Sequence, residues 1–363
     1  MHCLTFEHMR AKSKQFLETY LNNVSPTGFE HSGQSLWLNY LKPYIHETLI
    51  DTYGTAVGVI NPGMPYKVVL EAHADEISWF VNYISDEGYI YVIRNGGSDF
   101  QIAPSMRCNI HCENGSTVKG VFGWPAIHVR PDKNPETKQD TIFIDVGCAN
   151  RQEVEALGIH IGAVAVFEAD CFWLNKKYLV GRALDNRMGG FMIAEVARQL
   201  HEKKDILPFT LYLVNSVQEE IGLRGAEMIS RRLKPDVALI TDVTHDTQSP
   251  LYTKKIQGDC KCGKGAVLTY GPAVQNNLLQ QIISVAKANK IDIQRNAVSR
   301  STGTDTDSFA YSGMGVASAL ISLPLKYMHT TVETVHENDI ESCIQLMYHS
   351  VKSLKENQTF NYL

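Results

Sequence analysis

Five short segments of the chain carry imidazole and carboxylate side chains in a pattern that suits metal-dependent chemistry. The segments are 72–76 (AHADE), 184–187 (LDNR), 218–222 (QEEIG), 240–245 (ITDVTH) and 327–329 (YMH). Imidazole and carboxylate groups are ligands that zinc and similar ions accept in proteins. The adjacent pair Glu219 and Glu220 also offers one carboxylate as a general base beside bound metal. This inventory predicts a metal-dependent hydrolase with two zinc-like ions.

The surrounding sequence indicates which elements hold these segments. Apolar runs typical of buried strands occur at residues 67–72, 209–214, 237–241 and 316–323. Apolar residues at helical spacing occur at residues 191–200, 278–286 and 340–354. Alternating strands and helices predict an α/β fold with a mostly parallel sheet and helices on both faces. In such sheets, sites form beyond the carboxyl ends of the strands, where His73, Glu219 and Asp242 fall.

Residues 77–173 have a different texture, with short strand-like runs separated by turns. Asn114-Gly115 lies between two such runs, and Asn-Gly is a strong hairpin signal because both residues tolerate positive φ. Closely spaced short strands are typical of a small barrel or sandwich. We therefore expect a β-rich domain at 77–173, inserted into a catalytic domain that comprises 1–76 and 174–363.

The composition is that of an ordinary globular protein. The chain has 363 residues, of which 44% are apolar and 20% charged, and its formal net charge is -5. No basic run suggests nucleic acid, and no apolar stretch approaches the ~20 residues of a membrane span. The eight cysteines are scattered and the N-terminus lacks a secretory pattern. We expect a cytoplasmic protein without nucleic-acid or membrane partners.

The residue types also explain how a two-metal site would work. One carboxylate can bridge two cations ~3.5–4 Å apart, and water activated by such ions loses much of its proton affinity. A nearby carboxylate must take that proton and later deliver it to the leaving group. One carboxylate cannot be ligand and base at once, which explains the pair Glu219 and Glu220. Asp75 is close enough in sequence to accept the N–H of a ligating His73 and fix its tautomer.

Six motifs, in order along the chain, match one known family. They are 73–76 (HADE), 181–187 (GRALDNR), 218–226 (QEEIGLRGA), 242–245 (DVTH), 303–305 (GTD) and His329. Together they resemble the motifs of the M42 metallo-aminopeptidases, which include tetrahedral, glutamyl and deblocking aminopeptidases. The resemblance covers nearly the whole chain, and the two long motifs are specific.

The resemblance implies a fold, a metal site and a role for each site residue. The fold is of the di-zinc exopeptidase type, with residues 77–173 as a small β-barrel-like dimerisation domain. Two divalent ions are implied, zinc first, with cobalt or manganese as alternatives. The roles carried over by position are Asp185 as the bridging carboxylate, His73 and Asp242 as ligands of one ion, Glu220 and His329 as ligands of the other, Glu219 as general base, and Asp75 as the residue that orients His73.

The resemblance also implies partners. We expect short peptides as substrates and a homo-oligomer, from a dimer built through the insertion up to a hollow dodecamer. The chain departs from the family pattern at Ala74, where methionine is common, and at Ser78, where glycine is common. Thr330 and Thr331 stand where the family usually has Ser-Pro. These changes affect fine specificity more than the reaction.

Other functions stay open on the sequence. A related di-zinc amidohydrolase or carboxypeptidase would act on blocked amino acids instead of free N-termini. A glycosidase would use Glu219 and Glu220, although its carboxyl groups should lie ~5–9.5 Å apart on opposite sides of the bond. A scaffold that has lost catalysis is the third alternative. Alone, Asp185 is an ordinary helix N-cap and His329 an ordinary histidine; their joint occurrence in order favours the metal site.

Four further residues are weaker candidates. His245 matches the DVTH motif, and a structural or supporting role is its simplest interpretation. Asp305 belongs either to a loop near the family's substrate pocket or to an ordinary turn. Cys260 and Cys262 form a single CxC, which is a weak signal for a soft-metal site without a partner pair. The sequence assigns none of these residues a definite role.

Overall fold

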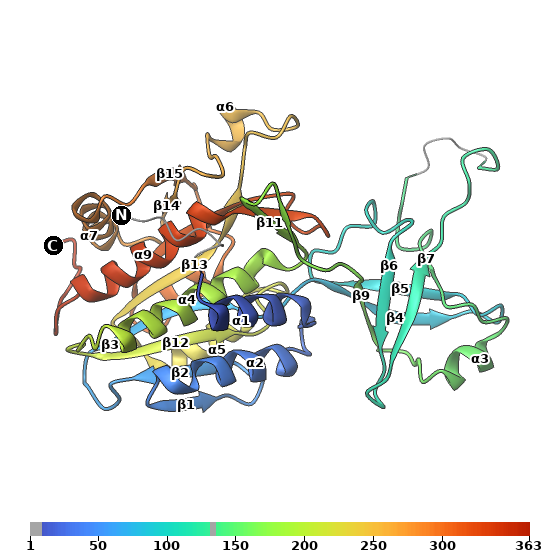
Figure 1. Ribbon diagram of the computed structural model, residues 1–363, viewed down its shortest axis with the longest axis horizontal. Coiled ribbons are helices and arrows are strands. Elements are labelled where there is room, and N and C mark those ends of the chain that lie inside the picture. Colours follow the sequence, from blue (N-terminus) through green and yellow to red (C-terminus); the bar gives the residue numbers. More distant parts are fainter. Residues whose placement is uncertain (1–8, 131–135) are drawn as a thin grey trace.

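The computed structural model describes residues 9–130 and 136–363. Figure 1 shows two parts: a large sheet covered by helices, and a barrel joined to it through the segments that lead into β4 and out of β9. The two parts have separate hydrophobic cores, one around Leu70, Phe191 and Leu213, the other around Trp79 and Phe122.

The large sheet contains eleven strands among the described residues. Along its main path they are β1 (Glu47–Ile50), β2 (Ala56–Ile60), β12 (Thr210–Ser216), β3 (Lys67–His73), β13 (Val237–His245), β16 (Ala317–Lys326), β17 (Glu333–His336), β11 (Tyr178–Gly181) and β10 (Phe172–Leu174). Two more, β14 (Ala266–Tyr270) and β15 (Ile293–Ala297), pair with each other, and β14 also pairs with β16.

Along its main path, the sheet is parallel in its centre and antiparallel toward both ends, and the side pair β14–β15 is parallel. Strands β12, β3, β13 and β16 run parallel to one another, whereas β1–β2, β16–β17 and β17–β11 are antiparallel pairs. The central strands are apolar and buried along most of their length, as expected for strands covered on both faces. The predicted α/β class with a helix-covered sheet is confirmed, and the sheet is mixed.

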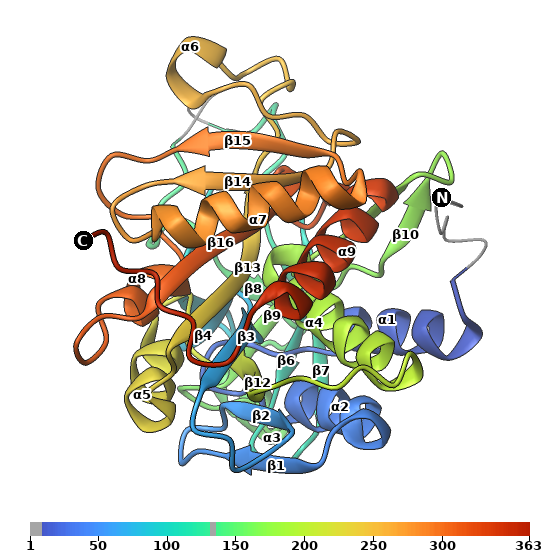
Figure 2. The same ribbon diagram turned by 90° about the vertical axis from the view of Figure 1, so that its left-hand side faces the viewer.

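Helices cover both faces of this sheet (Figures 1 and 2). One face carries α1 (Ala11–Asn22), α2 (His31–Leu41), α4 (Leu184–Glu202), α9 (Glu337–Ser353) and α7 (Asn276–Asn289); the other carries α5 (Arg224–Leu233) and α8 (Asp305–Ala310). The short helices are η2 (Lys42–Tyr44), α3 (Arg151–Ala156) and α6 (Lys254–Gln257). Nearly all of α4 is buried, so its apolar residues form the centre of the core. Within the described ranges, none of the helices is long and apolar enough to cross a membrane.

The barrel is closed by its own strands. Their order around it is β4 (Ser78–Ile84), β5 (Ile90–Asn95), β8 (Ile144–Asp145), β7 (Thr117–Phe122), β6 (Arg107–His111) and β9 (Val164–Phe167). The hairpin between β6 and β7 turns at Asn114-Gly115, with φ of 81° at Gly115, as its sequence predicts. These strands lie within residues 77–173, and the assignment of two domains with those boundaries stays a prediction.

Candidate metal centre

The predicted site residues converge at the edge of the sheet that faces the barrel (Figure 1). His73 ends β3, Asp242 lies in β13, Glu219 and Glu220 follow β12, Asp185 lies in the first turn of α4, and His329 follows β16. Parallel central strands end at a common edge, which is why segments far apart in sequence meet there.

Asp185 lies between the two predicted histidine ligands. Its Oδ1 is 3.2 Å from Nε2 of His73, and its Oδ2 is 3.2 Å from Nε2 of His329. Each carboxylate oxygen therefore faces a different imidazole nitrogen. This is the arrangement that a carboxylate bridging two cations requires.

The remaining predicted ligands complete two groups around Asp185. Asp242 Oδ1 lies 3.9 Å from Nε2 of His73, and Glu220 Oε2 lies 3.5 Å from Nε2 of His329. Within the described part of the chain, potential ligand atoms approach within 4.8 Å of one another in three groups: His73, Asp185 and Asp242; Asp185, Glu220 and His329; and His73, Glu219 and Glu220. The first two groups share Asp185 and together contain the five predicted ligands.

The charges of the site favour a cation. Burial, together with the carboxylates of Asp242 and Asp305, raises the pKa of Glu219 to about 10. Burial and the neighbouring Asp185 raise the pKa of Asp242 to about 8. The same two causes raise the pKa of Glu220 well above its usual value. Positive charge at the centre would lower all three pKa values, so this set of nitrogen and oxygen donors fits divalent metal.

Asp75 lies beside His73, and its hydrogen bonds go to other groups. Its Oδ1 is 3.4 Å from Nδ1 of His73 and accepts the N–H of Glu219 at 2.9 Å. Its Oδ2 accepts the N–H of Glu220 at 3.2 Å and the hydroxyl of Thr27 at 2.9 Å. Asp75 therefore fixes the backbone of the glutamate pair as well as facing the histidine.

Glu333 supports the site in a comparable way, and sequence reasoning did not identify it. Its carboxylate accepts the N–H of Asp185 at 3.1 Å and the N–H of His329 at 2.7 Å. Burial and the negative charge of Asp185 raise its pKa well above the usual value. One signal was present: in 331–336 (TVETVH), which is rich in the β-branched residues typical of strands, Glu333 would need a partner if that strand were buried.

A buried ion network holds the loop that carries Asp185. Glu76 pairs with Arg182 and lies 3.5 Å from Arg187, which is fully buried. Arg187 also donates to the backbone carbonyl of Tyr20 and stacks over its ring, with 4.6 Å from the guanidinium carbon to the ring centroid. The two arginines of the GRALDNR motif therefore join the start of α4 to the end of α1.

Three loops at the site adopt backbone conformations that side chains disfavour. Ala183, Gln218 and His329 have φ of 54°, 58° and 61°. Such left-handed conformations are uncommon for residues other than glycine and persist where the surroundings fix them. Their concentration beside the predicted ligands is typical of a functional site.

The weaker candidates lie outside the ligand groups. Asp305 is buried and accepts the hydroxyl of Ser216 at 2.6 Å. Nδ1 of His245 lies 3.3 Å from the hydroxyl of Tyr252. Cys260 and Cys262 are buried free thiols and belong to none of the groups found among the described residues. The structure thus offers no support for a soft-metal site at the CxC sequence.

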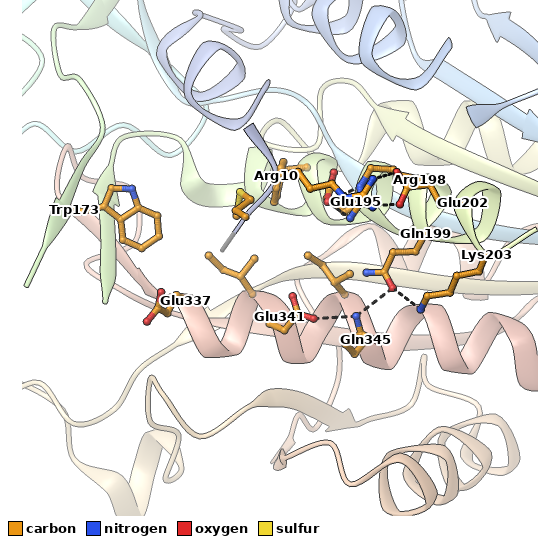
Figure 3. Close-up of a pocket in the computed structure, with 14 residues that line it drawn as sticks. Arg10, Trp173, Glu195, Arg198, Gln199, Glu202, Lys203, Glu337, Glu341 and Gln345 are labelled. Carbon is orange, nitrogen blue, oxygen red and sulfur yellow. Dashed lines mark hydrogen bonds and ion pairs between the residues drawn. The ribbon is translucent and has the colours of Figure 1, made fainter. Parts of the chain in front are cut away.

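Two cavities show how the site relates to the rest of the fold. A narrow one of about 20 Å³ lies between the barrel residues Ile77 and Phe167 and the predicted ligands Asp185, Glu220 and His329. A larger one of about 350 Å³ lies between α4 and α9 (Figure 3). Its charged side chains pair largely with one another, and none of the predicted ligands lines it. The first cavity alone belongs to the candidate site.

A mixed α/β sheet with clustered histidine and carboxylate ligands at its strand ends defines the class of α/β metallohydrolases. The family described as M42 glutamyl aminopeptidase matches residues 54–346. This chain belongs to the M42 peptidase family and is a peptide-bond hydrolase, and membership of this metallopeptidase family implies divalent metal.

Individual relatives agree with this family assignment. The lysyl aminopeptidase of Pyrococcus furiosus is 33% identical over 345 residues, which cover 94% of this chain and 97% of the relative. The TET aminopeptidase of the marine sediment archaeon Thaumarchaeota archaeon SCGC AB-539-E09 superimposes with a TM-score of 0.90 at 27% identity, covering 96% and 98%. The Pyrococcus horikoshii TET1 peptidase, which can assemble into a tetrahedron or a large octahedral shell, has a TM-score of 0.82 at 26% identity, covering 93% and 98%.

Proposed function

We propose that the chain is a two-metal aminopeptidase that removes N-terminal residues from short peptides. The observation that carries the proposal is the position of Asp185, whose two oxygens face the two histidines at equal distances of 3.2 Å. The relatives are named as aminopeptidases, which supports cleavage at the N-terminal end of the peptide.

Five side chains would hold the metal. His73, Asp242 and Asp185 would hold one ion, and Glu220, His329 and Asp185 would hold the other. Zinc suits these donors best, and cobalt and manganese are acceptable substitutes. When bound, such ions lower the pKa of water and polarise a carbonyl group.

Glu219 would move the proton during the reaction. Its Oε2 lies 3.9 Å from Nε2 of His73, so it faces the ligand cluster. It belongs to neither of the two groups that share Asp185, although it forms the third group with His73 and Glu220. As general base it takes the proton of the attacking water, and as general acid it returns that proton to the nitrogen of the leaving amine. Asp75 holds Glu219 in place through its backbone and faces Nδ1 of His73.

Peptide hydrolysis by the metal-reconstituted protein tests this proposal. Short peptides with free and with acetylated N-termini would be offered to chelator-stripped protein with zinc, cobalt or manganese restored. We expect metal-dependent release of N-terminal residues from the free peptides, and a roughly 10²–10⁴-fold lower kcat for Glu219→Gln. Cleavage of acetylated substrates alone would favour the amidohydrolase alternative, and no cleavage with any metal would refute the proposal.

We also propose that the protein is a cytoplasmic homo-oligomer assembled through the barrel, with 77–173 as the dimerisation domain. The assembly of the Pyrococcus horikoshii relative supports oligomerisation. Exposed apolar side chains on the barrel offer a surface for it: Tyr83, Tyr89, Val121, Leu157 and Ile161. The cysteines of the described residues are free thiols, which suits a reducing compartment.

Sedimentation velocity tests the proposed oligomer. We expect the wild-type protein to sediment as an oligomer and Val121→Glu to weaken that oligomer, because the substitution places a charge on the exposed apolar surface of the barrel. A monomeric wild-type protein would contradict the proposed assembly.

A further inference from the structure

Glu333 is a buried glutamate that holds two predicted metal ligands by their backbones. It is the first residue of β17, and its relative exposure is 2%. Its Oε2 accepts the N–H of Asp185 at 3.1 Å, and its Oε1 accepts the N–H of His329 at 2.7 Å. One carboxylate thus joins the first turn of α4, at the end of the loop from β11, to the loop after β16.

Both of these loops contain residues in the left-handed region. Ala183, two residues before Asp185, has φ of 54°, and Tyr327 and His329 both have φ of 61°. Residues with a Cβ hold such conformations where surrounding contacts fix them. Glu333 supplies such a contact to each loop, since charge-assisted hydrogen bonds to backbone N–H groups are among the stronger ones.

Glu333 lines the small cavity beside the predicted ligands but is not one of them. Both of its oxygens already accept backbone hydrogen bonds. It belongs to none of the ligand groups among the described residues, in contrast to Asp185 and His329, which share one. Its hydrogen bonds go to the ligands' backbones, so Glu333 can act on bound metal by fixing the positions of Asp185 and His329.

We propose that Glu333 is a positioning residue that sets the affinity for the ion that Asp185 and His329 share. The inference rests on the proposed function, because it requires metal at those ligands. Residues that orient metal ligands commonly change metal affinity 10–100-fold when they are replaced.

The substitution Glu333→Gln separates this role from packing. The amide has nearly the shape of the carboxylate and keeps one acceptor oxygen, but its NH₂ group then faces a backbone N–H. Two donors cannot bond, so one of the two loops loses its anchor. We expect the zinc ion held by Asp185, Glu220 and His329 to bind roughly 10–100-fold more weakly, because both Asp185 and His329 depend on Glu333; the other ion, which shares only Asp185, should weaken less.

A second substitution, Glu333→Asp, distinguishes position from charge. Aspartate keeps the negative charge but is one methylene shorter, so it cannot reach both N–H groups from the same backbone position. We expect zinc affinity to fall as in Glu333→Gln. Recovery of wild-type affinity in Glu333→Asp would show that charge alone matters and would overturn the positioning role.

Zinc binding itself is the measurement. Chelator-stripped full-length protein would be titrated with zinc in competition with a chromophoric chelator, which yields the dissociation constants. Thermal unfolding of the metal-free proteins would measure any structural effect separately. Glu341→Gln is the matched control, because Glu341 is a half-buried glutamate of α9 that bonds to Gln345 and lines the cavity of Figure 3.

The outcomes are distinct. The inference predicts weakened binding of one ion in Glu333→Gln and wild-type constants in Glu341→Gln. Wild-type zinc constants in Glu333→Gln would overturn it while leaving the proposed function intact. A failure of the proposed function looks different, because the unmodified protein would then bind no zinc or release no residue from any peptide.

Discussion

At the scale of single residues, two carboxylates that are not predicted ligands fix the positions of those that are. Asp75 accepts the N–H groups of Glu219 and Glu220, and Glu333 accepts that of Asp185. Each is nearly inaccessible to solvent, so its hydrogen bonds replace those it would make with water. The geometry of the site therefore depends on backbone anchors as much as on the ligands themselves.

The sequence indicates the predicted ligands far better than it indicates these anchors. His73, Asp185 and His329 stand in recognisable motifs because metal chemistry needs particular side chains. The contact of Glu333 with Asp185 arises from the antiparallel pairing of β17 with β11, which aligns Glu333 with Gly181. Such a pairing joins distant parts of the chain, and residue types alone do not reveal it.

At the scale of elements, the barrel reaches into the site through the turn after β5. The backbone of Gly97 lies against the ring of His329, and a Cβ added there would stand 2.6 Å from Nδ1. The neighbouring Gly96 has φ of 77° and lies close to Cβ of Glu220. Two predicted ligands therefore rest against glycines of the barrel, which links the barrel's position to the metal centre.

This contact makes a prediction for Gly97→Ala. The new methyl group must displace the ring of His329, because 2.6 Å is far inside van der Waals contact. We expect about tenfold weaker binding of one zinc ion, measured by chelator competition, with little change in thermal stability because Gly97 is exposed.

Gly123→Ala is the matched control for that prediction. A Cβ there would stand 2.5 Å from the ring of Phe143, so the crowding is similar, but no predicted ligand lies beside it. We expect any cost to appear in the stability of the barrel and not in zinc binding. Equal zinc affinity in Gly97→Ala and Gly123→Ala would show that the turn does not constrain His329.

Strands and helices could be predicted from the sequence where one pattern of apolar residues dominates a segment. The apolar run 237–241 and the helical pattern 191–200 correspond to β13 and α4, because burial on both faces demands continuous apolar sequence. The antiparallel sides of the sheet were not predicted, since an apolar run does not encode the direction of its neighbours. Within 77–173, the segment 141–146 (TIFIDV) contributes only the two-residue strand β8 (Ile144–Asp145).

At the scale of the whole molecule, the site lies where two separately packed parts meet. The larger part, with its sheet and helices, supplies all five predicted ligands, while Ile77 and Phe167 close one side of the small cavity beside them. A site at such a junction excludes water from several directions, which strengthens electrostatic interactions within it. Because both parts line this cavity, the proposed reaction depends on how the barrel is placed against the larger part.

The central claim is that this chain holds two divalent ions with Asp185 between them. The most direct test is the number of zinc ions retained per chain, determined by elemental analysis after saturation and removal of free metal. The geometry predicts two zinc ions for each chain, since both oxygens of Asp185 face ligand groups. One ion or none per chain at saturating zinc would contradict the account.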